Sequence, residues 1–201
     1  MTTALLVIDI QESFRQRPTW AAVSDPEIAA HAGRLVDAAR DRGDLVIWIS
    51  HTESDGDPAN PFEPANGYVR LIDGLAAQSG EPVLVKTSRN AFTSTNLQQL
   101  LVSAGVRELV ICGIQTEQCC ETTARLGADL GYDVTFVTEA TATFPIAHRD
   151  APADRPLAEL LADPRTLGTD AIVERTEYAL AGRFATIRTV DEVAGALTPV
   201  V

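Results

Sequence analysis

Short runs of Leu, Val and Ile alternate along this chain with longer amphipathic segments. The apolar runs predict strands over residues 5–8, 45–50, 83–85, 109–112, 134–138 and about 186–189. Because these runs are continuously apolar, they suit a parallel sheet that is buried on both faces. Helical periodicity marks residues 26–42, 97–104, 117–131 and about 170–181. The order of elements predicts an α/β fold, a three-layer α/β/α sandwich around a doubly wound six-stranded parallel sheet.

Two stretches interrupt this alternation and are expected to be loops. Residues 54–67 read SDGDPANPFEPANG and residues 144–156 read FPIAHRDAPADRP, both rich in Pro and Asp. Both follow the carboxyl ends of strands, the edge where open α/β sheets bind ligands. They are expected to line a substrate site, in this chain or in a neighbouring subunit, or else to be plain surface loops. No linker is apparent, so one domain is expected over residues 1–201.

Composition narrows the classes of function. Hydrophobic residues make up 45% of the 201 residues, and no apolar run approaches the length needed to span a bilayer. The N-terminal segment resembles no secretory signal, so we expect a cytoplasmic protein with no membrane partner. The net charge of −12 argues against a nucleic-acid partner. Three cysteines, an odd number, indicate free thiols in a reducing compartment.

Two adjacent cysteines are the first candidates for a reactive group. The stretch LVICGIQTEQCCETTAR, residues 109–125, runs a strand through a turn at Gly113 into a helix whose first turn holds Cys119 and Cys120. Backbone N–H groups at a helix start lack partners and carry the positive end of the helix dipole, which can lower a cysteine pKa. Either thiol is therefore a candidate nucleophile, whereas Cys112, inside the strand, is expected to be a core residue.

Two charged residues are further candidates because of their positions at the ends of strands. Asp9 and Lys86 each come directly after an apolar strand, so both should emerge at the ligand edge of the sheet beside the Gly113 turn. Lys86 is the only lysine, while the other fifteen basic residues are arginine. Taken singly, the acid could be a turn former, the amine a solvated strand end and the thiol a core residue. Together they predict that an acid, an amine and a thiol converge.

Four motifs resemble the isochorismatase-like cysteine hydrolase superfamily. They are LLVIDIQESF, KTSRNAFTSTNLQQLL, LVICGIQTEQCCETTAR and GYDVTFVTEATATF, and they span most of the chain. The resemblance implies an Asp-Lys-Cys triad at Asp9, Lys86 and Cys119, with Cys120 at a position where the family usually has Val. It also implies a cis peptide bond between Ile114 and Gln115 and an oxyanion hole made by the amides of Gln115 and Cys119.

The resulting hypothesis is hydrolysis of a linear amide, carbamoyl or ureide C–N bond through a thioacyl enzyme. Asp9 would accept the thiol proton of Cys119, Lys86 would stabilise the charges, and the turn amides would hold the oxyanion. Cys120 would point about 100° away from Cys119 on the helix, so a redox pair is disfavoured and Cys120 should pack beneath the helix.

No metal and no other cofactor are expected. The nicotinamidase branch of the family carries an Asp-x-His pair and a further His, but this chain has only His31, His51 and His148, and WISHTESDGD contains no Asp-x-His. Nicotinamidase activity is therefore not expected, and His51 is expected to be a polar pocket or loop residue.

Two other functions stay open. One is an isochorismatase proper, which hydrolyses a vinyl ether and in well-known members lacks the cysteine; the other is a catalytically silent oligomer that binds small molecules. The resemblance also implies a homo-oligomer with a small-molecule substrate. Candidate pocket residues, each with a core or surface alternative, are Phe14, Trp20, Phe62, Arg89, Phe92 and Phe144.

Overall fold

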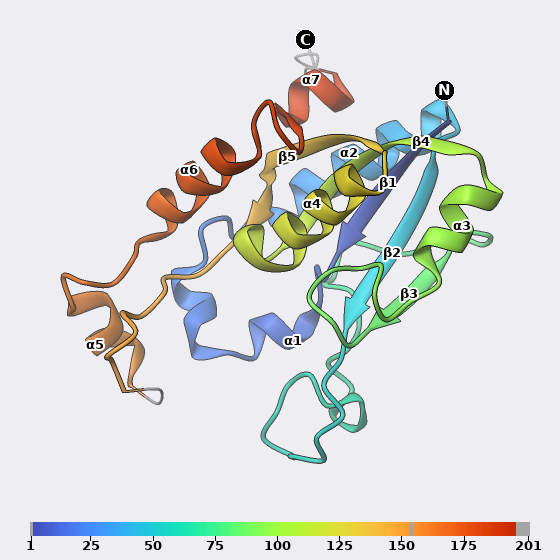
Figure 1. The fold of residues 1–201 in the computed structure, drawn as a ribbon. Helices are drawn as coiled ribbons and strands as arrows, with labels where there is room; N and C mark the ends of the chain where they lie inside the picture. Colours follow the sequence, from blue (N-terminus) through green and yellow to red (C-terminus); the bar gives the residue numbers. More distant parts are fainter. Residues whose placement is uncertain (1, 153–154, 196–201) are drawn as a thin grey trace, which may run out of the picture.

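One six-stranded sheet organises the molecule (Figure 1). The computed structural model describes residues 2–152 and 155–195. Every strand pairing in the sheet is parallel, and the spatial order is β3-β2-β1-β4-β5-β6. The strands are β1 Thr2–Ile8, β2 Leu45–His51, β3 Val83–Lys86, β4 Val106–Ile114, β5 Asp133–Ala142 and β6 Thr186–Arg188. The predicted fold class and all six strands are confirmed.

The main difference from the predicted strands is the length of β5. The apolar run predicted a strand over residues 134–138, but β5 continues to Ala142. A register shift between Ile111 and Gly113 lets the polar second half of β5 pair again, with Thr141 beside Gly113. Hydrophobicity alone could not show this extension, because its only apolar side chains are two small buried alanines, Ala140 and Ala142, set among polar residues.

Helices cover both faces of the sheet. The longer ones are α2 Ile28–Arg42, α3 Leu97–Ser103, α4 Glu121–Asp129 and α6 Thr169–Leu180. The helix predicted over residues 117–131 begins instead with a π-helical turn, Thr116–Cys120, before α4. Short helical elements that periodicity could not predict are α1 Glu12–Arg15, α5 Leu157–Ala162, α7 Val190–Ala194 and the 3₁₀ turns Pro18–Ala22 and Pro64–Asn66. No helix of the described ranges is both long and apolar enough to cross a membrane.

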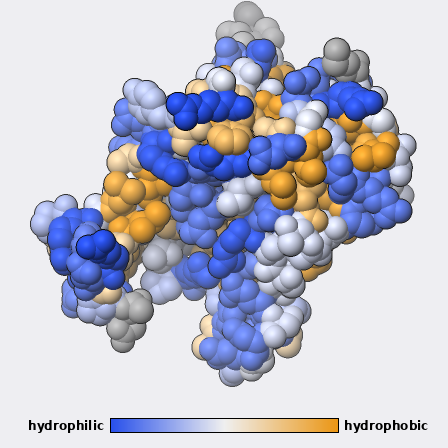
Figure 2. Space-filling view, viewed as in Figure 1, coloured by the Kyte–Doolittle hydropathy of each residue, from blue (hydrophilic) through white to orange (hydrophobic). Residues whose placement is uncertain are grey.

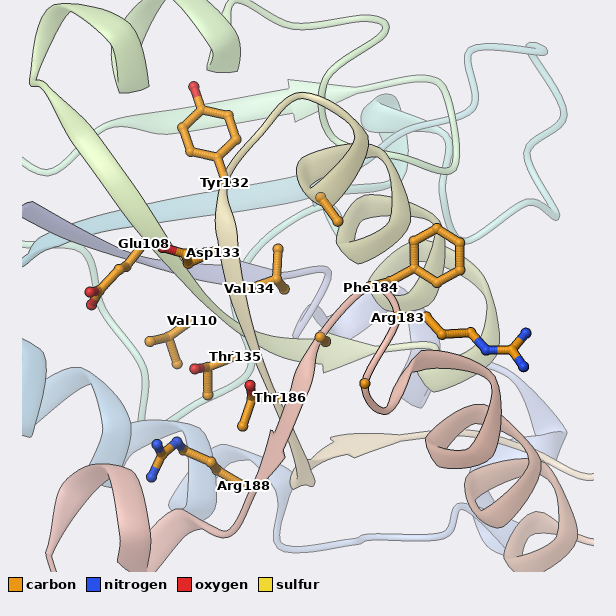
Figure 3. A pocket seen from close by; sticks show the side chains of 13 residues that line it. Glu108, Val110, Tyr132, Asp133, Val134, Thr135, Arg183, Phe184, Thr186 and Arg188 are labelled. Carbon is orange, nitrogen blue, oxygen red and sulfur yellow. The ribbon is translucent and has the colours of Figure 1, made fainter.

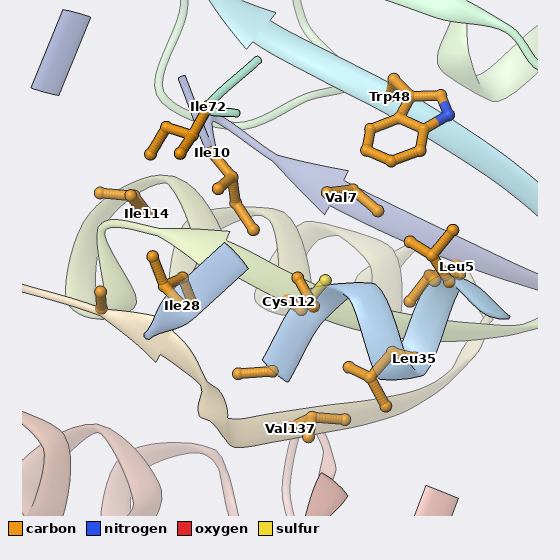
Figure 4. Packing of buried hydrophobic residues seen from close by; sticks show 14 of the residues in the cluster. Leu5, Val7, Ile10, Ile28, Leu35, Trp48, Ile72, Cys112, Ile114 and Val137 are labelled. Carbon is orange, nitrogen blue, oxygen red and sulfur yellow. The ribbon is translucent and has the colours of Figure 1, made fainter. Parts of the chain in front are cut away.

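Alternate residues of the strands belong to two separate hydrophobic cores, one on each face of the sheet. Leu5 and Val7 of β1 pack with α2 on one face, where Leu35 meets Cys112 and Val137 (Figure 4). Ala4, Leu6 and Ile8 of the same strand belong to the cluster on the other face, which α3, α4 and α6 cover. Burial on both faces explains the continuous apolar runs, since neither side of the strand meets water.

The chain reverses its direction of travel across the sheet between β1 and β4. From β1 it proceeds outward through β2 to β3, and from β4 outward through β5 to β6. The carboxyl ends of β1 and β4 therefore flank the switch point, where sheets of this type bind ligands. The loop after β2, teal in Figure 1, extends beyond this edge and presents a mostly hydrophilic surface in Figure 2.

A partly exposed carboxylate ties α2 to the strands at the far edge of the sheet. Glu81 accepts hydrogen bonds from Arg40 Nε at 2.7 Å and Trp48 Nε1 at 2.6 Å. The hydrogen bonds from Arg40 hold the pKa of Glu81 at about 2, below its ordinary 4.5. Because the folded-state pKa is lowered, this stabilisation exists above the unfolded pKa and is lost as pH falls from about 4.5 to 2.

We expect Glu81→Gln to lower the free energy of unfolding by about 2 kcal/mol at neutral pH. The deficit should shrink as pH falls through the same window. Urea unfolding of both proteins from pH 7 to pH 2.5 measures this, with Glu174→Gln as the exposed control. A deficit that stayed constant across the pH range would contradict the assignment.

Gly113 permits the close approach of β4 to the end of β1. Its φ is +142°, and a Cβ at this position would lie 2.0 Å from the Ile8 carbonyl oxygen. Ile8 and Gly113 are register partners, and the next residue after Ile8 is Asp9. A side chain at Gly113 would therefore separate the two strand ends that form the switch point.

Gly113→Ala should cost about 3 kcal/mol or more of stability, because both the backbone conformation and the contact with Ile8 must change. Gly131→Ala is the matched control: φ there is +90°, but nothing lies within 4 Å of the added Cβ. That variant should lose only about 1 kcal/mol. Thermal and urea unfolding compare the stability losses of the two variants. Equal losses would show that the contact with Ile8 does not contribute to the effect of Gly113→Ala.

Candidate active site

Three buried polar side chains meet at the carboxyl edge of the sheet. Lys86 Nζ donates a hydrogen bond to Asp9 Oδ2 at 2.7 Å and lies 3.4 Å from Cys119 Sγ. Asp9 and Lys86 are fully buried and Cys119 is 4% exposed. The structure thus brings together the acid, the amine and the thiol that the strand ends predicted.

Each member has its position fixed by the backbone. Asp9 follows β1 with a φ of +54°, a left-handed conformation that Asp tolerates better than most residues, and its N–H donates to Ile49 O at 2.7 Å. Lys86 is the last residue of β3 and pairs in register with His51 at the end of β2. Cys119 lies in the π-helical turn that follows β4.

Gln11 extends the sheet with its side chain and so positions His51. Gln11 Nε2 donates to the His51 carbonyl oxygen at 2.9 Å, and the His51 N–H donates to Gln11 Oε1 at 2.7 Å. This pair imitates a strand pairing between the segment after β1 and the end of β2. The His51 ring is thereby held with Nδ1 3.5 Å from Lys86 Nζ and Nε2 3.2 Å from Glu53 Oε1.

Burial governs the protonation of two of these three side chains. Burial raises the pKa of Asp9, although the Lys86 ammonium opposes the shift, and Asp9 Oδ1 has no hydrogen-bond partner within the described ranges. Burial, reinforced by the Asp9 charge, raises the pKa of Cys119 to about 12. The prediction of a helix-lowered thiol pKa is therefore wrong. Desolvation of the sulfur and the Asp9 charge outweigh the stabilisation by the Lys86 charge, so the resting sulfur is a thiol.

A cavity of about 220 Å³ opens onto the thiol. Of the predicted pocket residues, Phe14, Phe62 and Arg89 line it, as do Gln115 and Cys119 of the predicted oxyanion turn. Sequence reasoning missed the remaining lining residues as binding groups: Arg17, Glu53 and Gln118, together with His51, for which it expected only a general pocket or loop role. For His51 and Glu53 a signal existed, because both stand at or just beyond the carboxyl end of β2.

Three predicted pocket residues lie elsewhere. Phe144 stacks on the far side of Phe14 with ring centroids 5.8 Å apart, and Trp20 packs on Phe144 at 6.1 Å. They support the cavity wall without lining it. Phe92 belongs to the core cluster on the other side of the sheet, where it stacks on Tyr132 at 6.3 Å. Proximity to Lys86 in sequence suggested a pocket role, but the chain turns Phe92 toward α4.

The two predicted loops differ in their relation to the site. Phe62, from residues 54–67, lines the cavity of its own chain. Of residues 144–156, none that the structure describes lines it. The peptide bond between Ile114 and Gln115 is cis, the geometry that the resemblance implies. Cys112 and Cys120 are free and fully buried, Cys120 in the core cluster beneath the helix.

A larger hollow lies at the opposite end of the sheet. About 610 Å³ in volume, it is lined by the amino-terminal ends of β4, β5 and β6, including Glu108, Asp133 and Thr186, with Arg188 at one side (Figure 3). Among the described residues, no cysteine, histidine or lysine lines it. Of these two hollows, the smaller one over Cys119 is therefore the one lined by a candidate nucleophile.

Within residues 2–152 and 155–195, no three His, Cys, Asp or Glu side chains gather as a set of metal ligands. His51 faces an ammonium and a guanidinium, with Arg89 Nη1 3.0 Å from its Nε2. Burial, followed by the charge of Lys86, lowers the pKa of His51. Metal independence of the chemistry stays a prediction.

Comparison with known proteins places this site in a family. The model of the isochorismatase domain matches residues 3–167. The chain is 31% identical over 193 residues to the uncharacterized isochorismatase family protein YddQ of Bacillus subtilis (strain 168), covering 95% of this chain and 98% of that protein. It is 32% identical over 183 residues to a streptothricin hydrolase of Streptomyces noursei, covering 90% and 71%. The crystal structure of an isochorismatase from Pseudomonas putida KT2440 matches with a TM-score of 0.77 and 28% identity over 95% of this chain and 89% of that one. The chain belongs to the isochorismatase family of hydrolases.

Proposed function

We propose that this hydrolase cleaves a linear amide, carbamoyl or ureide C–N bond of a small molecule, without a metal, through a thioacyl intermediate on Cys119. One observation carries the proposal: the ammonium of Lys86 bridges a buried carboxylate at 2.7 Å and a thiol at 3.4 Å. The similar streptothricin hydrolase is a hydrolase by its name, which agrees with the class of reaction. An intact thiol beside a base disfavours both the vinyl ether reaction and a silent binding role.

The first half of the reaction acylates the enzyme. Cys119 Sγ attacks the carbonyl carbon while Asp9 Oδ1, which has no hydrogen-bond partner among the described residues, takes the thiol proton. Lys86 remains hydrogen-bonded to Asp9 Oδ2 and its charge stabilises the sulfur as it becomes anionic. Backbone amides of the turn from Gln115 to Cys119, which lines the cavity, hold the oxyanion. Collapse breaks the C–N bond as Asp9 returns the proton to the leaving nitrogen.

The second half restores the thiol. Asp9, again a carboxylate, removes a proton from water as the water oxygen attacks the thioester carbon. The tetrahedral species then expels sulfur, which regains a proton from Asp9, and the acid departs. Because burial raises the pKa of Cys119, the thiol proton leaves as the sulfur attacks, and the same carboxylate serves as the base in both halves.

Cys119→Ala should lower kcat/KM by about 10³-fold or more against whichever amide, carbamate or ureide the enzyme hydrolyses. Amine or ammonia release across a substrate panel measures the loss, and intact mass of the wild type should show an acyl adduct on Cys119 during turnover. Cys120→Val is the matched control, since that thiol packs in the core. Undiminished turnover by Cys119→Ala would exclude the proposed nucleophile.

Asp9→Asn separates thiol ionisation from catalysis. Removing the carboxylate leaves the Lys86 charge unopposed beside the sulfur, so the pKa of Cys119 should fall while turnover drops by about 10² to 10⁴-fold. The pH dependence of iodoacetamide alkylation at Cys119 reports the pKa, with Cys119→Ala as the background and Asp73→Asn as the exposed control. A pKa that rises, or turnover that survives, would argue against Asp9 as the base.

A further inference from the structure

The wall of the catalytic cavity carries an excess of positive charge. Two guanidinium groups, Arg17 and Arg89, line it together with one carboxylate, Glu53. The Asp9 and Lys86 charges at its base compensate each other through their hydrogen bond. The whole chain has a net charge of −12, so a locally positive cavity runs against the overall balance.

Arg17 is held by aromatic rings and not by an acid. Its guanidinium carbon lies 4.5 Å from the Phe62 ring centroid and 5.6 Å from that of Phe14. No carboxylate of the described ranges lies within ion-pair distance of it. The side chain is only partly exposed, and a half-buried cation whose N–H groups have no acidic partner is suited to receive one from a ligand.

Glu53 cannot neutralise both arginines. Its carboxylate already faces three other groups: His51 Nε2 at 3.2 Å, Asn60 Nδ2 at 3.2 Å and Arg89 Nη1 at 3.5 Å. Arg89 is thus paired with this carboxylate, whereas the charge of Glu53 reaches Arg17 only from beyond ion-pair distance. The pocket also limits the size of the ligand, because about 220 Å³ is below the 300 to 1,000 Å³ typical of drug-sized ligands.

We propose that the substrate is a small amide or ureide that carries a carboxylate, and that Arg17, assisted by Arg89, binds this carboxylate while the amide carbon meets Cys119. This inference rests on the proposed hydrolysis and names its substrate class. Arg17 acts here as a specificity determinant that touches substrate. The planar guanidinium, steadied by Phe62, offers two parallel N–H donors that match a carboxylate.

Matched substrate pairs test the charge requirement. Succinamate is paired with 4-methylpentanamide, and N-carbamoylglycine with isobutylurea; in each pair two methyl groups replace the carboxylate oxygens. Ammonia release should give the wild type a kcat/KM about 10-fold or more higher for the anionic member. Arg17→Gln should lower that value by about 10- to 100-fold, chiefly through KM, and change the neutral member by less than about 3-fold.

Controls separate charge recognition from a structural role. Arg17→Lys keeps the charge without the planar fork and should retain part of the preference. Arg15→Gln removes a nearby arginine that pairs with Glu12 and does not line the cavity, so it should keep the wild-type preference. Loss of both members of a pair in Arg17→Gln would indicate a structural role and would overturn the proposal, as would equal wild-type use of both members.

Binding to Cys119→Ala distinguishes failure of this inference from failure of the proposed function. If no pair is hydrolysed, calorimetry with succinamate and N-carbamoylglycine still probes the site. Binding of these anions that Arg17→Gln abolishes would support the carboxylate subsite while the proposed hydrolysis fails. Absence of binding by both anions would overturn the subsite.

Discussion

The ion pair between Asp9 and Lys86 is the interaction on which the rest of the site depends. Both partners are fully buried and their atoms lie 2.7 Å apart. Transfer of two charges from water to a protein interior is costly, and such a pair is seldom more stable than well-packed apolar residues. A buried ion pair beside a thiol is therefore better explained by the proposed catalytic role than by a contribution to stability. Loss of either partner would leave an unpaired charge in the core, which couples the stability of the fold to the geometry of the candidate active site.

The strand order brings Asp9 and Lys86 together, and only a few other residues are needed to complete the arrangement. β1 and β4 are neighbours at the switch point, and the absence of a side chain at Gly113 lets them close up directly before Asp9. Lys86 comes from β3, which β2 and β1 separate from β4 in the sheet. Its long side chain spans the end of β2 to reach the thiol. The side chain of Gln11 continues the pairing between strands past their ends, so His51 stands beside the ammonium instead of entering solvent.

The sequence predicted the features that depend on the order of elements. Asp9, Lys86 and the helix-opening thiol each follow a strand, and parallel topology alone brings such positions to one edge. Features that depend on three-dimensional surroundings could not be predicted. The pKa of Cys119 is set by desolvation, which no local pattern encodes. Arg17 was missed because it lies outside the strands, in a short turn between α1 and a 3₁₀ segment, and it lines the cavity beside the rings of Phe14 and Phe62.

The charge of the whole chain constrains how an anionic substrate could be selected. At a net charge of −12 the protein repels anions at long range, but physiological salt screens exposed charges over about 8 to 10 Å. Recognition must then occur inside the cavity, where guanidinium groups act over a few ångströms and water is partly excluded. Selection would therefore depend on contact with Arg17 and Arg89 and not on electrostatic steering. Added salt should leave the preference between charged and neutral substrates largely intact, because a guanidinium–carboxylate contact inside the cavity is screened less than charges at the surface.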